Sequence, residues 1–103
     1  MLEFNERKLI RVLQREGWHD HEIEAMISLL DKVTDRLQKP FDEWLDHQAV
    51  SDEPLVEGLS IQTIMKLRKC HFLDALTIMD TYLDHPDLAK QYKNLFQSAE
   101  VNE

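Results

Sequence analysis

Five histidines and one cysteine are the nitrogen and sulfur side chains of this sequence that could ligate a zinc ion. A zinc site needs paired ligands at a defined spacing, together with a second pair elsewhere in the chain. Here only His19 and His21 stand close together, and Cys70-His71 is an isolated pair of adjacent residues. Adjacent helical residues point about 100° apart, so these two side chains do not easily ligate one ion. We therefore expect no metal ion and no other cofactor.

Covalent catalysis and nucleotide binding also lack their usual residues. Cys70 lies between Lys69 and His71, which could activate an exposed thiol, but a lone cysteine in an apolar helical stretch is more often a small core residue. A phosphate-binding loop needs several glycines, whereas this chain has only Gly17 and Gly58. The sequence thus predicts no catalytic residue, and we expect the protein not to be an enzyme.

The segment from His71 to Ala75 distantly resembles the His-x-Leu-Lys-Gly core of histidine phosphotransfer domains, which are small acidic helical bundles. This resemblance covers five residues and implies that His71 would carry the phosphoryl group. The family has a basic residue and a glycine where this sequence has Asp74 and Ala75, and a carboxylate there would repel the phosphoryl group. Phosphotransfer is accordingly the third hypothesis.

The segment from Gly58 to Lys69 resembles the turn and recognition helix of helix-turn-helix proteins. By that resemblance, two sets of residues would contact DNA: Ile61, Gln62 and Lys66 at the groove, and Arg68 and Lys69 at phosphates. The preceding helix should hold a small residue about four positions before the glycine, where this chain has Pro54 among acidic residues. A DNA-binding transcriptional regulator is therefore the alternative function.

Residues 40–59 carry no lysine or arginine but six acidic residues: Asp42, Glu43, Asp46, Asp52, Glu53 and Glu57. They supply most of the net charge of −8. Uncompensated local charge steers association and selects partners more than it stabilises a fold. We expect these acids to form a face that binds a protein partner with a basic or mixed surface, and self-association as a homo-oligomer stays open. Nucleic acid is less favoured, and the competing role of the acids is to maintain solubility.

The elements that must position these residues are predicted to be helical, because strand-rich folds need more turn residues than two glycines and three prolines. We predict the all-α class, as a compact bundle of four to five helices. One domain is expected over residues 1–97, with residues 98–103 as a frayed tail.

Cap residues and apolar periods locate the helices. Asn5 should begin a first helix that Gly17 ends, with a buried apolar side and an exposed basic side of Arg7, Lys8, Arg11 and Arg15. Asp20 should begin a second helix that continues to Pro40, which would itself open a third. Ser60 is a predicted cap, Pro86 begins the last helix, and residues 60–83 form one helix or two, with Asp74 as the cap of the second.

Cysteine usage and hydropathy suggest a location. Cys70 cannot form an internal disulfide, and the first residues lack the layout of a secretory signal, so we expect a reducing, cytoplasmic environment. No apolar run approaches the roughly 20 residues that span a bilayer, which argues against membrane insertion.

Overall fold

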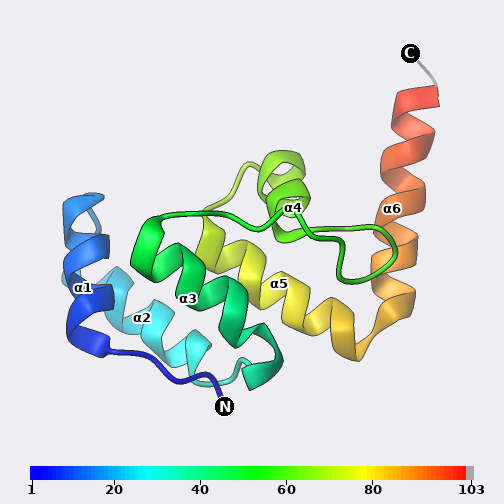
Figure 1. The fold of residues 1–103 in the computed structure, drawn as a ribbon. Helices are drawn as coiled ribbons and strands as arrows, with labels where there is room; N and C mark the ends of the chain where they lie inside the picture. The colour runs from blue at the N-terminus through cyan, green and yellow to red at the C-terminus, as the bar shows by residue number, and fades with distance from the viewer. Residues whose placement is uncertain (102–103) are drawn as a thin grey trace. The chain divides into compact units, whose positions relative to one another are not determined.

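Six α-helices and one short 3-10 helix make up the regular structure of this computed structural model, which describes the backbone of residues 1–101 and the side chains of residues 1–95 (Figure 1). They are α1 (Glu6–Arg15), α2 (Asp20–Leu30), η1 (Asp35–Leu37), α3 (Gln38–His47), α4 (Ile61–Arg68), α5 (Phe72–Asp84) and α6 (Pro86–Val101). The described backbone contains no strand, and its isolated bridge joins Val56 to Leu59. The predicted all-α class is confirmed, with one more α-helix than the four to five expected.

Residue contacts divide the chain into two compact units. The first unit, Met1–Val50, contains α1 to α3 and η1, and the second unit, Ser51–Glu103, contains α4 to α6. A single domain over residues 1–97 stays a prediction. In the predicted tail, α6 is helical as far as Val101, and residues 102 and 103 lie outside the described part of the chain.

Local capping defines both ends of α1, as the sequence predicted. The side-chain oxygen of Asn5 accepts a 3.2 Å hydrogen bond from the backbone N–H of Lys8. After the helix, Gly17 adopts a φ of 93°, which a residue without a Cβ atom tolerates best. The N–H of Trp18 then returns to the carbonyl of Leu13 at 3.0 Å, the long bond of a Schellman motif.

The second helix is shorter than predicted. We expected it to run from Asp20 to Pro40, but α2 ends at Leu30, and Thr34 adopts extended backbone before η1. The predicted role of Pro40 is also corrected, since it lies in the first turn of α3, where backbone N–H groups have no helical partner. The residue that caps α2 is His19, whose backbone N–H donates to Glu22 at 2.9 Å.

The core of the first unit contains apolar residues from all its helices. Phe41 is fully buried, and its ring lies 5.6 Å from that of Phe4 and 6.3 Å from that of Trp44, measured between centroids. Full burial of an apolar side chain contributes about 1.5–3 kcal/mol. The buried apolar residues of this unit are Leu2, Leu9, Leu13, Ile23, Met26, Leu30, Val33, Leu37, Phe41, Trp44 and Leu45.

The stretch of residues 60–83 forms two helices. Ser60 begins α4 as predicted, because its Oγ accepts a 3.1 Å hydrogen bond from the N–H of Thr63. Lys69 ends α4 in the left-handed conformation, with a φ of 52°. The cap of α5 is His71, whose Nδ1 accepts from the N–H of Leu73 at 3.1 Å, so the predicted cap at Asp74 is wrong.

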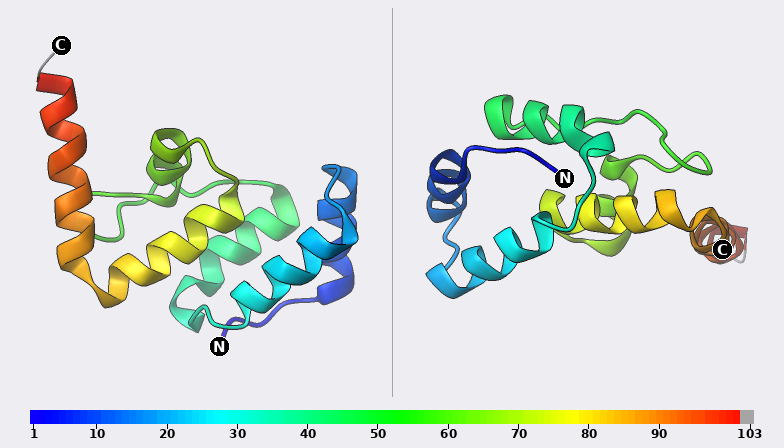
Figure 2. Two further views of the ribbon diagram at one scale, coloured as in Figure 1. Left: turned by 180° about the vertical axis from the view of Figure 1, so that it is seen from behind. Right: turned by 90° about the horizontal axis from the view of Figure 1, so that it is seen from below.

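Among the side chains that are described in the second unit, α5 contributes the most buried ones. It packs against α4, and α6 begins at Pro86 as predicted and runs at a steep angle to α5 in both views of Figure 2. As far as residue 95, the buried apolar residues of this unit are Leu59, Ile61, Ile64, Phe72, Leu73, Ala75, Leu76, Met79, Tyr82 and Ala89. None of the described helices has the length and apolar character needed to cross a membrane.

Candidate functional site

Three of the predicted partner-binding acids lie on α3. Asp42 and Asp46 are exposed and stand one turn apart, while Glu43 is half-buried. Asp42 accepts a 2.8 Å hydrogen bond from the side-chain amide of Gln38. Asp46 forms an ion pair with Lys8 of α1, and the hydrogen bond and positive charge of Lys8 lower the pKa of Asp46. The charge of Asp46 is therefore partly compensated, whereas Asp42 and Glu43 keep theirs.

A shallow hollow of about 390 Å³ lies beside these acids on α3. Its lining residues are Gln38, Lys39, Asp42, Glu43, Asp46 and His47. Three carboxylates and one lysine give this hollow a negative balance, which suits a cationic side chain of a partner better than an anionic one.

The other three acids, Asp52, Glu53 and Glu57, lie on the connector of residues 48–60 that precedes α4. All three are exposed, and none forms an ion pair with a residue whose side chain is described. The connector is shaped by its own backbone, since the N–H of Leu55 donates to the carbonyl of Leu59 at 2.9 Å. These acids belong to the second unit and the α3 acids to the first, so each group is described by itself, and one shared acidic face stays a prediction.

The residues of the alternative DNA-binding helix do not share one environment. Lys66 and Lys69 are exposed, and Gln62 is half-buried. Ile61 is fully buried, which corrects its predicted place at a DNA groove, because the first residue of α4 packs into the core. Arg68 is also exposed, but its guanidinium contacts two tyrosines of the second unit.

Two tyrosines hold the Arg68 guanidinium. It donates a 2.9 Å hydrogen bond to the Tyr82 hydroxyl and lies 4.8 Å from the centre of the Tyr92 ring. Burial alone would lower the pKa of Arg68, but the hydrogen bond to Tyr82 and the electrostatic interactions with both tyrosines raise it. Arg68 therefore stays charged while it joins α4 to α5 and α6.

The residues considered for metal or nucleophilic chemistry are dispersed. The rings of His19 and His21 stack with centroids 5.8 Å apart, but no group of three or more His, Cys, Asp or Glu side chains suited to a metal ion occurs among the described residues. Cys70 is half-buried, and burial, together with the negative charge of Asp74, raises its pKa. A raised pKa favours the thiol, which is a weaker nucleophile than the thiolate.

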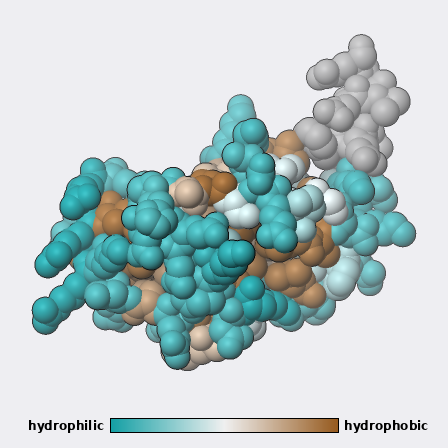
Figure 3. All heavy atoms as spheres, in the orientation of Figure 1, coloured by the Kyte–Doolittle hydropathy of each residue, from teal (hydrophilic) through white to brown (hydrophobic). Residues whose placement is uncertain are grey.

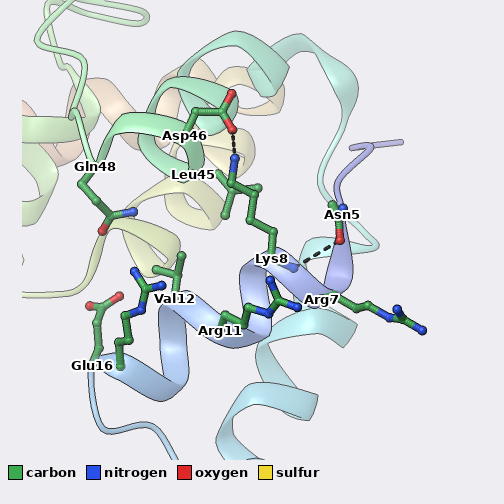
Figure 4. A pocket seen from close by; sticks show the side chains of 10 residues that line it. Asn5, Arg7, Lys8, Arg11, Val12, Glu16, Leu45, Asp46 and Gln48 are labelled. Atoms are coloured by element: carbon green, nitrogen blue, oxygen red, sulfur yellow. Dashed lines mark hydrogen bonds and ion pairs between the residues drawn. The ribbon is translucent and has the colours of Figure 1, made fainter.

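A basic groove in the first unit was not predicted from the sequence. Arg7, Lys8, Arg11 and Arg15 were expected only to form the exposed side of the first helix. They border a groove of about 690 Å³ between α1 and the end of α3 (Figure 4). The four-residue spacing of Arg7, Arg11 and Arg15 was the available signal, but the opposite wall of the groove depends on tertiary packing. Comparison with protein-family models, with curated proteins and with solved structures found no match for this chain.

Proposed function

We propose that this protein is a non-enzymatic interaction module that binds a protein partner with a basic or mixed surface. The main support for this proposal is that Asp52, Glu53 and Glu57 are exposed and form no ion pair with any described side chain. Unpaired carboxylates retain their full field, which attracts a cationic partner and sets the orientation of the encounter.

The backbone of the connector holds these charged residues in a defined conformation. The bridge between Val56 and Leu59 and the positive φ of Gly58 turn the chain back on itself, and Ser51 accepts a 3.2 Å hydrogen bond from the N–H of Glu53. A surface that is ordered before binding loses less conformational entropy on association. The acids of α3 form a second contact region of the same sign.

The non-enzymatic part of the proposal is supported by the raised pKa of Cys70, and the cytoplasmic location expected from this lone cysteine is kept as part of the proposal. DNA binding by α4 is less favoured, because Ile61 is buried and Arg68 is held by tyrosines. A second copy of this chain remains one candidate for the partner, since the chain carries both acidic and basic surfaces.

The test compares two variants that lose the same number of negative charges. The first neutralises the connector by Asp52→Asn, Glu53→Gln and Glu57→Gln. The matched control neutralises exposed acids elsewhere, by Glu24→Gln, Asp31→Asn and Asp87→Asn. We expect quantitative pull-down from a lysate, followed by titration of the captured partner, to show weaker binding for the connector variant only.

A DNA-binding measurement tests the alternative function. Binding to random duplex DNA is measured across a salt series, because phosphate contacts impose a steep dependence on salt. If the connector variant stays folded and keeps every partner, whereas Lys66→Ala with Arg68→Ala loses them, the acidic surface is not the binding site. Binding through the basic side of α4 would then replace it.

A further inference from the structure

The groove between α1 and the end of α3 has a positive lining. It lies wholly within the first unit, and its lining residues are Asn5, Arg7, Lys8, Arg11, Val12, Arg15, Glu16, Leu45, Asp46 and Gln48. Four of these are cationic and two are anionic, and Asp46 is already paired with Lys8 (Figure 4). Its volume of about 690 Å³ falls within the usual range of binding sites, roughly 300–1,000 Å³.

The three arginines form the accessible charge of the groove. Arg7, Arg11 and Arg15 are exposed, and none of them forms an ion pair with another residue of the first unit. Hydrophilic side chains cover most of α1 on the face shown in Figure 3. A guanidinium presents its N–H donors in a planar fork that matches a carboxylate, so each arginine can accept one acidic side chain.

The spacing of these arginines fits an extended chain. Arg7, Arg11 and Arg15 follow one another at four-residue intervals, which places them about 6 Å apart along the helix axis. In an extended peptide, side chains on one face recur every 6.6 Å or so. Carboxylates at alternate positions of such a peptide can therefore meet successive arginines, while Asn5 and Gln48 offer polar groups to its backbone.

The charge of the whole unit limits the length of the ligand. The first unit contains seven basic and eleven acidic side chains, so a long polyanion that extends beyond the groove meets net repulsion. A short acidic segment that contacts only the arginines avoids most of this electrostatic repulsion. This difference favours a peptide over a nucleic acid.

We propose that this groove binds an extended acidic segment of a protein, with Asp or Glu at alternate positions. The site has the opposite sign to the acidic connector, lies in the other unit and does not depend on the proposed function. Asp46 weakens the site, because it adds a negative charge and holds the ammonium group of Lys8.

The experiment uses a fluorescein-labelled ten-residue peptide of alternating Glu and Ser, with fluorescence anisotropy in about 50 mM salt, where screening is modest. We expect saturable binding that weakens about tenfold or more in the triple variant Arg7→Gln, Arg11→Gln, Arg15→Gln, because three charge contacts with the peptide are lost together. The matched control, Lys32→Gln, Lys39→Gln, Lys90→Gln, removes the same charge outside the groove and should change the affinity less than about twofold. Asp46→Asn should tighten binding.

Equal losses in the two triple variants would show that only net charge matters and would overturn the proposal, as would the absence of saturable binding to the wild type. Tighter binding of a ten-nucleotide oligothymidylate than of the peptide would assign the groove to nucleic acid and overturn it too. If the triple arginine variant loses helix content by circular dichroism, the opposite effects expected of Arg11→Gln and Asp46→Asn decide the question. Loss of peptide binding with intact binding of the connector's partner would separate this site from the proposed function.

Discussion

The guanidinium of Arg68, at the end of α4, donates a 2.9 Å hydrogen bond to the hydroxyl of Tyr82, a buried residue in the last turn of α5. The Tyr82 ring lies 6.0 Å from the ring of Tyr92, over which the same guanidinium stands. One residue from each of three helices thus meets in a single cluster. Because α6 joins α5 through a sharp junction at Pro86, this cluster helps to fix the direction of α6.

We predict that Arg68→Met destabilises the protein by about 1–2 kcal/mol, through loss of the hydrogen bond and the cation–π contact. Urea unfolding followed by circular dichroism measures the change. Lys66→Met is the control on the same helix, since Lys66 is exposed, and should stay within about 0.5 kcal/mol of the wild type. Equal effects of the two substitutions would show that the cluster contributes nothing specific.

Leu30 and Leu76 were assigned to the core from their apolar periods, and both are fully buried, one in each unit. We predict that Leu30→Ala and Leu76→Ala each cost about 2–5 kcal/mol in the free energy of unfolding, because each leaves a cavity. Leu29→Ala is the control, since Leu29 is 46% exposed. Losses below about 1 kcal/mol at both buried positions would be inconsistent with these cores.

Two helix ends have a residue with a positive φ, which is a glycine after α1 and a lysine after α4. Gly17 has a φ of 93° with no atom within 4 Å of an added Cβ, so Gly17→Ala should destabilise by about 1 kcal/mol through backbone strain alone. Lys69 has a φ of 52°, so Lys69→Gly should leave stability unchanged or raise it, by up to about 1 kcal/mol. Thermal unfolding of both variants tests the pair. A stabilised Gly17→Ala protein would contradict the left-handed geometry at Gly17.

The caps of α1 and α4 were predictable, because they depend on a few adjacent residues. The bonds of Asn5 to Lys8 and of Ser60 to Thr63 need nothing beyond the segment that contains them. The end of α2 was not predictable from its apolar period, because Val33 remains buried after the turn and continues the same pattern. A period reports which side chains are buried, and not whether the helix is continuous.

The candidate sites show the same division between local and tertiary information. Composition revealed the acids of residues 40–59, but their separation into two units depends on where chain contacts are sparse. The arginine stripe of α1 was visible as a charged helix side, whereas the groove beside it required α3 to lie against α1. The engagement of Arg68 by Tyr92 joins residues far apart in sequence, which no local pattern encodes.

The ion pair between Lys8 and Asp46 predicts a specific pH dependence. Lys8 lowers the pKa of Asp46, so the pair contributes stability above the ordinary aspartate value of about 4 and loses it as the pH falls through the lowered value. Lys8→Gln should raise the pKa of Asp46 toward its ordinary value, and salt should reduce the difference by screening. An NMR titration of the Asp46 carboxyl measures this pKa directly. Lys32→Gln, which removes an exposed charge elsewhere in the first unit, should leave it unchanged. If both lysine variants raise the Asp46 pKa equally, general electrostatics rather than the ion pair would account for the lowered value.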